Sequence, residues 1–463
     1  MKILHITASY KPAFIYGGPI YSVAALCEEL NAESLKLKAE SGIPFTNHHA
    51  TMTVYTTLAN GKTELPYQNG AEKIVEGVSV KYFKRITKDH SHFSPTLLIQ
   101  LWRNAKKFDI IHIHAWWNLV SMGAVIICLM KGIKPIVSPR GMLGDYTFST
   151  AKKLFHQLMG KFLLRKCYFH ATTPMEAKEI AKRVFDGKAA IVDLMEIEVE
   201  SGKWKVESGK SGVRSPQIEV ESGKLKVESE KWKVESEEVE SGKLKVESEK
   251  WKVESEEVES GRKEKGMGKQ IFIIHNMVKV PENLPVKTRV FDGDLKLIFL
   301  SRIHHKKGIE LLLDALAMLT FPFTLTIVGE GELDYVKSLK LKVESLKLTG
   351  QIDWIGAVYG DQKFQLLADH DALILPSWHE NFANVVIESI AVKTPVILSD
   401  QVGLSDFIKK NNFGLVCELN SLRISEALNN YYELLKQESG IKITNFNPDH
   451  IKELYLNLYE RIY

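Results

Sequence analysis

Short apolar runs typical of buried strands alternate with helical segments through the second half of this chain. The expected strands lie at residues 296–301, 324–328, 352–355, 372–375, 396–398 and 414–416. Strands that alternate with helices predict a parallel sheet, because parallel neighbours need a long crossover connection. The first half repeats the pattern, with strands expected at 2–7, 108–114 and 134–138 and a helix over 20–30. The sequence therefore predicts the α/β class, with two parallel-sheet domains.

Composition places few demands on the environment of the protein. The chain has 463 residues, 44% of them hydrophobic, which is enough for two cores of ordinary size. Its formal net charge of +4 is too small to favour nucleic acid as a partner. The four cysteines show no metal-ligand spacing, which indicates reduced thiols in a cytoplasmic protein. We expect no signal peptide, and the apolar stretch 119–130 is too short to span a bilayer.

A repetitive segment interrupts the first domain. Residues 224–242 recur without change at 243–261, and related hexamers stand at 36–41, 203–208 and 340–345. The segment 193–270 has too few large apolar side chains to build a core, so it is predicted to be a low-complexity insert. Either local strands or a helix would suit its pattern. The hexamer at 340–345 differs, because Leu339, Val343 and Leu346 have the spacing of one helical face.

These observations predict the domain boundaries. The N-terminal domain should comprise residues 1–192 and 271–280, on either side of the insert 193–270. A linker at 281–294, rich in Pro, Asn and Asp, should lead to the second domain at 295–440. The last segment, 441–463, should contain a terminal helix.

Two carboxylates follow the strand expected at 372–375. Glu380 should lie on the loop at the strand end, and Glu388 in the first turn of a helix that starts near Ile387. In an open α/β sheet, ligands bind outside the carboxyl ends of the strands. Carboxylates there can accept hydrogen bonds from the vicinal hydroxyls of a ribose or hexose, and a helix start offers N–H groups to a phosphate.

Two cations stand at the end of the strand expected at 296–301. Arg302 supplies a planar fork of donors and Lys307 a point charge, and such a pair suits a diphosphate. A diphosphate site beside a hydroxyl-binding carboxylate pair predicts a nucleotide-sugar site.

The order Ser301-Arg302-x4-Lys307-Gly308, then Gly329-Glu330-Gly331, then Glu380-x7-Glu388 resembles the donor half of the retaining glycosyltransferases of family 4. These enzymes have the GT-B fold, in which two Rossmann-like domains face a cleft, and their terminal helix often packs back on the first domain. The segment 275–278, His-Asn-Met-Val, resembles the family's Pro-Asn-Gly-Val but departs at two of four positions.

The resemblance implies a role for each residue of the donor half. Arg302 and Lys307 would hold the donor diphosphate, Glu388 the ribose, and Glu380 the transferred sugar as a catalytic residue. The remaining donor-binding positions it implies are Gly329 and the backbone of Phe382, Ala383 and Asn384. Ala383 stands where the family usually has Gly.

The glycines Gly17 and Gly18 enter the expected helix over 20–30, which lets the backbone approach a ligand closely. An ordinary strand-to-helix turn explains them equally well from the residues alone. The resemblance implies that they face the donor phosphates.

Further candidates stand at the ends of two other N-terminal strands. The resemblance implies a histidine near the reacting sugar, which we assign to His114, leaving His112 as a structural residue. Trp116 and Arg140 are candidate acceptor contacts. Arg140 would suit an anionic acceptor or a phosphate, although a surface ion pair explains an arginine there almost as well.

Residues 151–166 form a basic amphipathic pattern, with Leu154, Leu158 and Phe162 on one face. Such a helix can lie on an anionic membrane surface. A helix of the domain with a solvated basic face is the other reading.

The resemblance implies a metal-independent hexosyltransferase that moves a sugar from a nucleotide-sugar to a glycan or lipid-linked acceptor with retention. We expect bacterial surface polysaccharide or lipopolysaccharide synthesis, in the cytoplasm or at the inner face of the plasma membrane. No Asp-x-Asp motif stands in a suitable loop, and no cofactor besides the donor substrate is expected. Two alternatives stay open: a non-catalytic interaction protein that keeps the fold, and a nucleotide-sugar epimerase.

Overall fold

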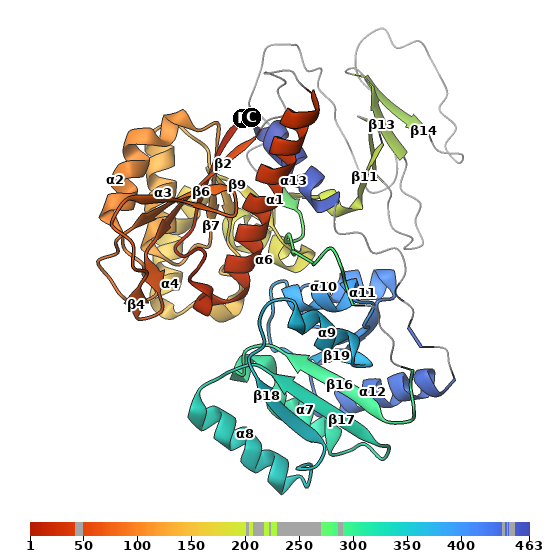
Figure 1. The fold of residues 1–463 in the computed structure, drawn as a ribbon. Coiled ribbons are helices and arrows are strands. Elements are labelled where there is room, and N and C mark those ends of the chain that lie inside the picture. The colour runs from red at the N-terminus through yellow and green to blue at the C-terminus, as the bar shows by residue number, and fades with distance from the viewer. Residues whose placement is uncertain are drawn as a thin grey trace.

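The computed structural model describes residues 1–41, 50–200, 203–206, 217–221, 224–228, 270–285, 290–437, 440–441, 443 and 450–463. Two α/β domains contain most of these residues (Figure 1). The C-terminal domain, in cyan and blue, lies below the N-terminal domain, in red and orange (Figure 1).

A nine-stranded sheet forms the centre of the N-terminal domain, in the order β10-β15-β9-β8-β7-β1-β2-β6-β5. Neighbouring strands are parallel except β5, which is antiparallel to β6. The strands are β1 (Lys2–Ile6), β2 (Thr51–Thr57), β5 (Ala71–Val75), β6 (Val78–Phe83), β7 (Ile110–His114), β8 (Ile136–Ser138), β9 (Tyr168–Ala171), β10 (Ala190–Asp193) and β15 (Gln270–Ile273). A small hairpin, β3 (Ala59–Asn60) with β4 (Thr63–Glu64), lies outside this sheet. The three strands expected in this half are confirmed as β1, β7 and β8.

Helices cover both faces of this sheet, so its strands bury apolar side chains on each side. The helices are α1 (Gly18–Ser41), α2 (Pro95–Asn104), α3 (Leu119–Met130), α4 (Thr150–Phe155), α5 (Lys161–Leu164), α6 (Pro174–Phe185) and α13 (His450–Ile462). On β1, Ile3 packs in one core with α1 and α13, whereas Leu4 packs in a second core with α2, α3 and α6. Burial on both faces explains why the strands read as nearly continuous apolar runs.

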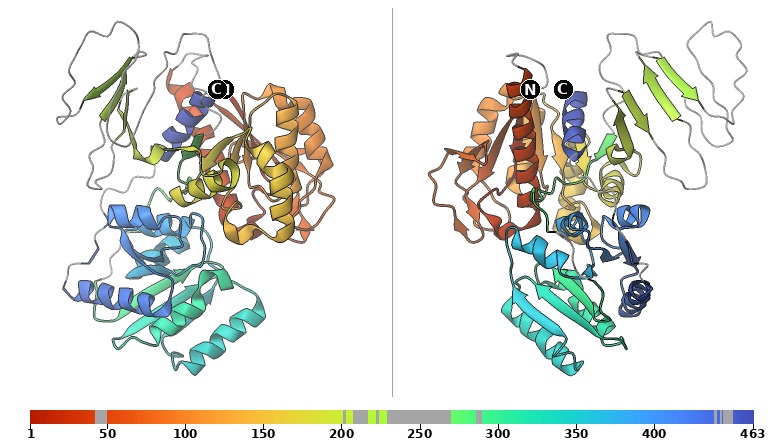
Figure 2. Two further views of the ribbon diagram at one scale, coloured as in Figure 1. Left: turned by 180° about the vertical axis from the view of Figure 1, so that it is seen from behind. Right: turned by 45° about the vertical axis from the view of Figure 1, so that its right-hand side comes forward.

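The last helix, α13, returns to the N-terminal domain and lies beside α1 (Figures 1 and 2). Tyr455 and Tyr459 of α13 are fully buried in the core that also contains Ile3 of β1. Ile441 and Ile443 still pack against the C-terminal core, so the chain leaves the second domain a few residues later than 441. The terminal helix is therefore an integral part of the first domain.

A six-stranded, wholly parallel sheet forms the centre of the C-terminal domain, in the order β18-β17-β16-β19-β20-β21. Its strands are β16 (Leu295–Leu300), β17 (Phe323–Val328), β18 (Ile352–Gly356), β19 (Ala372–Leu375), β20 (Val396–Ser399) and β21 (Gly414–Cys417). Its helices are α7 (Ile309–Leu316), α8 (Leu333–Ser345), α9 (Gln362–Ala368), α10 (Asn384–Ala391), α11 (Ser405–Asn411) and α12 (Ser421–Lys436). All six strands expected from the sequence are confirmed. The hexamer at 340–345 belongs to α8, where Leu339 and Val343 are buried as their spacing predicts.

The insert joins two neighbouring parallel strands of the first sheet. β10 and β15 pair with Ile191 opposite Ile271. Asp193 belongs to β10, Leu194 is buried in the first core, and Gln270 begins β15, so the insert is shorter than the predicted 193–270. Because a parallel pair needs a crossover of about a dozen residues or more, the segment supplies a necessary connection.

Two stretches of the insert are described, and both are antiparallel hairpins. One pairs β11 (Ile197–Glu200) with β12 (Lys203–Val206), and the other pairs β13 (Gln217–Glu221) with β14 (Lys224–Glu228). Of the two readings left open by the sequence, strands therefore hold in these stretches. The rest of the duplicated segment lies outside the described residues, as do residues 286–289 of the linker. Val278 and Val280 already pack against the C-terminal core, so the first domain ends slightly before residue 280.

We predict that Tyr455→Ala destabilises the N-terminal domain strongly, whereas Tyr463→Ala does not. Tyr455 lies within α13 and Tyr463 directly follows this helix, but Tyr455 is 0% exposed and Tyr463 is 70% exposed. Removing a buried aromatic ring costs about 3–5 kcal/mol. Urea unfolding of the two variants measures the difference, and equal unfolding midpoints would contradict the packing of α13.

Candidate functional site

Lys307 and Glu380 meet at the carboxyl ends of two strands of the C-terminal sheet. The Lys307 ammonium pairs with a carboxylate oxygen of Glu380, and the two side chains are only 13% and 23% exposed. A Cβ on Gly308 would lie 2.0 Å from the carbonyl oxygen of Pro376, so glycine allows the two loops to touch. Its φ of +68° also favours glycine. The structure thus brings together a predicted donor cation and the predicted sugar-binding carboxylate.

Glu388 lies one turn deeper in its helix than the sequence predicts. Helix α10 begins at Asn384, so Glu388 is in the second turn, and the expectation of a first-turn position is wrong. The helix starts early because Ala383, at φ +63°, turns the chain into it. An oxygen of Glu388 accepts a hydrogen bond from Lys363 Nζ at 2.6 Å. This bond fixes one carboxylate oxygen of Glu388, and the second oxygen of Glu388 takes no part in it.

The loop before α10 buries the side chains of Phe382 and Ala383. Phe382 is buried in the C-terminal core, so its ring is not available to a ligand. Ala383 adopts the left-handed conformation that glycine adopts at little cost. This conformation explains why the family that the sequence resembles usually has glycine at this position.

The glycine loop of the N-terminal domain faces two of the predicted donor residues of the other domain, Arg302 and Asn384. A Cβ on Gly17 would lie 4.0 Å from Arg302 Nε, and the carbonyl oxygen of Gly18 accepts a hydrogen bond from Asn384 Nδ2 at 3.4 Å. The N–H of Gly17 donates to the carbonyl oxygen of Phe14, so Gly17 offers close approach and no free donor. We call the region around these contacts, where Gly17 and Gly18 approach Arg302 and Asn384, the domain junction.

Gly329 has a structural reason for being glycine. A Cβ at this position would lie 1.9 Å from the carbonyl oxygen of Ser301, next to Arg302. The residue lets the ends of β16 and β17 pack closely. A direct donor contact by Gly329 stays a prediction.

The sequence interpretation missed Asn381 and Glu176, which connect the two domains. Asn381 Nδ2 donates to Thr172 Oγ1 at 2.8 Å and to Glu176 Oε2 at 3.2 Å. Glu176 is buried, and its other oxygen accepts from the N–H of Gly141 at 2.6 Å. Thr173-x-x-Glu176 at the start of α6 has the capping-box pattern, which is the sequence signal that could have indicated this carboxylate.

Lys306 is a further cation that sequence reasoning did not single out. Its ammonium lies 4.3 Å from the ring centroid of Tyr146 in the N-terminal domain. Burial lowers the pKa of Lys306, and the charges of Arg302, Lys152 and Lys307 lower it further, while Glu380 raises it. No carboxylate in the described part of the chain pairs with Arg302. Cations of both domains, Arg302 and Lys307 of one and Lys152 of the other, therefore lie near Lys306.

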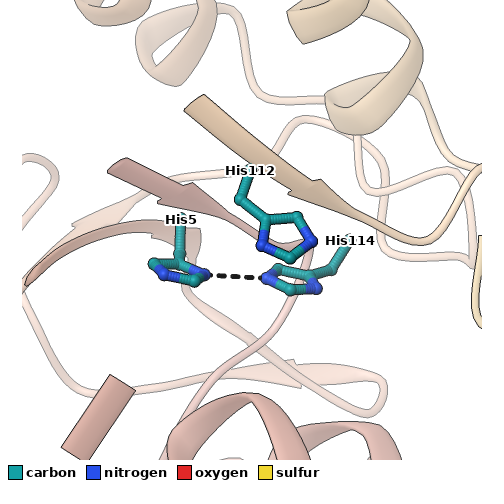
Figure 3. A group of neighbouring side chains, drawn as sticks. All are labelled: His5, His112 and His114. Atoms are coloured by element: carbon teal, nitrogen blue, oxygen red, sulfur yellow. Dashed lines mark hydrogen bonds between the residues drawn. The ribbon is translucent and has the colours of Figure 1, made fainter. Parts of the chain in front are cut away.

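Three buried histidines lie together at the carboxyl ends of β1 and β7 (Figure 3). His5 Nδ1 and His114 Nε2 are 2.9 Å apart, joined by a hydrogen bond. Both nitrogens of His112 are bonded to hydroxyl groups, Nδ1 to Tyr459 at 2.8 Å and Nε2 to Ser138 at 2.6 Å. The assignment of a structural role to His112 agrees with these contacts.

These imidazoles are near enough to one another to be considered as metal ligands. Nitrogens that share a tetrahedral Zn²⁺ each point at the metal, at about 2.0–2.1 Å from it. Here the nitrogens of His5 and His114 point at each other, and those of His112 point at hydroxyl groups. The arrangement fits a hydrogen-bonded cluster better than a metal centre.

His114 is not on the open surface of the junction. It is buried, and its two ring nitrogens contact His5 and Arg140, the latter at 3.2 Å. A direct contact with a sugar is therefore not available to His114 as it lies here, and that prediction is wrong for this arrangement. Burial lowers its pKa far below the ordinary value, with a further contribution from the charge of Arg140.

Trp116 is fully buried in the second core of the N-terminal domain, so the prediction of an acceptor contact is wrong. The cause is local: Ala115, at φ +69°, turns the chain directly after β7, and Trp116 packs inward. Arg140 does lie at the junction. It donates to Asn276 Oδ1, whose amide nitrogen donates to Asn384 Oδ1 at 3.2 Å.

Comparison with known proteins finds similarity in the C-terminal part of the chain. Residues 281–446 match the family model of the glycosyl transferases group 1. An uncharacterized glycosyltransferase of Methanocaldococcus jannaschii is 31% identical over 27% of this chain and 32% of its own length. A glycogen synthase of Mycobacterium tuberculosis is 30% identical over 32% of this chain and 36% of its own. The chain thus spans about a third of the length of these curated relatives.

Solved structures show the fold of the whole chain. HepE from Anabaena, in complex with UDP and glucose, has a TM-score of 0.56 at 14% identity and covers 100% of this chain and 97% of its own. The catalytic domain of starch synthase IV from Arabidopsis thaliana, bound to ADP and acarbose, has a TM-score of 0.58 at 11% identity, covering 100% and 99%. The predicted GT-B fold, with two Rossmann-like domains, is confirmed.

We predict that the protein loses stability as the pH falls from 7 to 5, in part through His5. Burial, followed by the charge of Arg140, lowers the pKa of His5 from 6.5 to about 3. Below pH 6.5 the unfolded chain therefore binds a proton that the folded chain does not, so the free energy of unfolding decreases with decreasing pH. His5→Asn should reduce this slope by about 1.4 kcal/mol per pH unit.

Urea unfolding midpoints at fixed ionic strength measure this slope. His90→Asn, at an exposed position, is the matched control. If the free energy of unfolding of His5→Asn and of the wild type depends on pH in the same way, His5 is not buried in the neutral form.

Proposed function

We propose that this protein is a glycosyltransferase that moves a hexose-type sugar from a nucleotide-sugar to an acceptor. The observation that carries the proposal is the group of Lys307, Glu380 and Arg302 opposite the Gly17–Gly18 loop, in a chain whose residues 281–446 match the glycosyl transferases group 1. Among similar structures, HepE was solved with UDP and glucose. By analogy, the donor would lie on the C-terminal domain and the acceptor mostly on the other.

The chemistry follows from where charge develops. When the bond between the anomeric carbon and the phosphate oxygen breaks, the leaving diphosphate becomes more negative. Arg302 and Lys307 would stabilise that charge together with the N-terminal end of α10. The cations would carry the charge that a metal ion carries in other transferases, and we propose no cofactor besides the donor.

Glu380 would position the transferred sugar, and Glu388 the ribose. Glu380 is already oriented by Lys307. We propose that the acceptor attacks on the side of the leaving group, that the departing phosphate takes its proton, and that the anomeric configuration is retained. Glu380 is then a binding carboxylate and forms no bond to the sugar.

An exposed apolar surface on the N-terminal domain, which we propose is membrane-facing, is the basis for proposing a lipid-linked acceptor. In α4, the π-helical turn His156–Gly160 and α5, Leu154 is 58%, Leu158 74% and Phe162 62% exposed. The segment also packs into the domain core through Leu164, Phe155 and Leu163, as a domain helix with a solvated basic face would. Basic side chains flank the three exposed residues, so we propose that this surface contacts an anionic membrane. No helix among the described residues has the length and apolar character needed to cross a bilayer.

The biological setting is inferred from the relatives. They include a putative teichuronic acid biosynthesis glycosyltransferase of Bacillus subtilis and a lipopolysaccharide core biosynthesis glycosyltransferase of Rhizobium meliloti. We propose a role in surface polysaccharide or lipopolysaccharide synthesis, at the inner face of the plasma membrane.

We predict that one of UDP, GDP and ADP, or a sugar conjugate of it, raises the melting temperature of the protein. Glu388→Ala should weaken nucleotide binding because the ribose contact is lost, whereas Glu380→Ala should mainly lower turnover. Glu344→Ala, at an exposed position of α8, is the control. A thermal-shift panel and titrations test this. Equal nucleotide affinity of wild type and Glu388→Ala would remove the ribose assignment.

We predict that the membrane-facing surface is required for binding to anionic vesicles. Leu158→Glu with Phe162→Glu should abolish co-sedimentation with vesicles that contain phosphatidylglycerol, because the apolar contact and the charge attraction both weaken. Leu341→Glu, on α8, changes a side chain that is 65% exposed and should have no effect. Unchanged vesicle binding in the double variant would contradict the proposed membrane contact.

A further inference from the structure

Arg140 is a cation without an acidic partner at the domain junction. It follows β8, is half-buried, and donates to Asn276 Oδ1 and to His114 Nδ1. Both acceptors are neutral groups. No carboxylate in the described ranges forms an ion pair with Arg140, and its Nε is buried without a hydrogen-bond partner. The reading of Arg140 as one half of a surface ion pair therefore finds no support.

The carboxylate beside Arg140 is fully engaged elsewhere. Glu176 accepts from the N–H of Gly141, from the N–H and Oγ1 of Thr172 at 2.8 and 2.9 Å, and from Asn381 Nδ2. Four donors from three residues use its lone pairs. Glu176 thus holds the two domains together and leaves Arg140 without a direct counter-ion.

The histidines under Arg140 cannot supply a negative charge either. A guanidinium only donates, so His114 Nδ1 must accept and its Nε2–H must donate to His5 Nδ1. The remaining His5 Nε2–H is buried without a partner. The hydrogen-bond pattern therefore assigns both imidazoles as neutral, with their donors directed away from Arg140.

A half-buried cation without an anion is unfavourable, and an anionic ligand would remove that cost. The position of Arg140 indicates where such an anion would lie. Asn276 connects Arg140 to Asn384, and a Cβ on Gly141 would lie 2.9 Å from the Cβ of Asn381. Arg140 therefore lies beside the 381–384 loop, on the N-terminal domain, whereas Arg302 and Lys307 belong to the other domain.

We propose that Arg140 binds an anionic group, a phosphate or a carboxylate, on the acceptor. The inference rests on the proposed glycosyltransferase function and narrows its acceptor to a negatively charged glycan or a lipid-phosphate-linked one. The planar guanidinium matches both groups through paired hydrogen bonds. A carboxylate on the donor sugar has the same chemistry, and the experiment separates the two sources.

The experiment uses inorganic phosphate as the probe, with the full chain and constant ionic strength. Phosphate relaxation in ³¹P NMR is measured with and without a saturating nucleoside diphosphate, which occupies the donor diphosphate site. We expect phosphate binding to persist with nucleotide bound, and to weaken roughly tenfold or more in Arg140→Gln. Arg103→Gln, which removes an exposed arginine of α2, should leave it unchanged.

A second variant keeps the proposal falsifiable if Arg140→Gln does not fold. Asn276→Asp replaces the amide that Arg140 contacts with a carboxylate of almost the same shape, which would neutralise Arg140. It should abolish phosphate binding while the nucleotide still binds. Phosphate binding that survives in Arg140→Gln or in Asn276→Asp, or that disappears when nucleotide binds, overturns the proposal.

Comparison of UDP-glucose with UDP-glucuronate separates donor from acceptor. If Arg140 serves the acceptor, the two donors should respond equally to Arg140→Gln. A selective loss of UDP-glucuronate affinity would show that Arg140 binds a carboxylate of the donor sugar, and it would overturn the acceptor assignment. If no nucleotide binds at all, the donor proposal fails, while the phosphate measurement on the free protein still decides the role of Arg140.

Discussion

Parallel pairing puts the carboxyl ends of all strands of a sheet at one edge, and the two sheets of this protein turn these edges toward each other. The contacts between Gly17 and Arg302, and between Gly18 and Asn384, follow from that arrangement. So does the pairing of Lys307 with Glu380, since β16 and β19 are neighbours. Residues far apart in the chain thereby form one polar junction where cations of both domains lie close together, as the proposed anionic donor would require.

Buried polar contacts stabilise the part of the junction that the N-terminal domain supplies. Tyr459 and Tyr455 of α13 bond to His112 and His170, and Ser138 joins these two histidines. The final helix therefore stabilises the strand ends from which the junction is built. Buried polar groups are costly when unpaired, so this network favours one arrangement of the strand ends over alternatives. A change in α13 should consequently affect the junction as well as the stability of the fold.

The strands, and the placing of Lys307 beside Glu380, could be predicted from sequence because both depend on local pattern. The apolar run that Pro376 ends indicates the end of a strand without any knowledge of the rest of the fold. Glu380 follows this strand end closely. Trp116 and His114 could not be predicted in this way, because a left-handed residue at Ala115 and burial under Arg140 decide where their rings lie. The start of α10 was missed for a similar reason, since Ala383 adopts a conformation that sequence pattern does not favour for alanine.

Hydrogen exchange of the backbone amides, measured with and without saturating UDP, GDP or ADP, tests the central claim that both domains build one donor site. With the nucleotide that binds, we expect slower exchange at the start of α1, after Gly18, and also at the start of α10, from Asn384 to Glu388. Slower exchange in the C-terminal domain alone would show that the N-terminal loop takes no part. Slower exchange at neither position would contradict the account of the site.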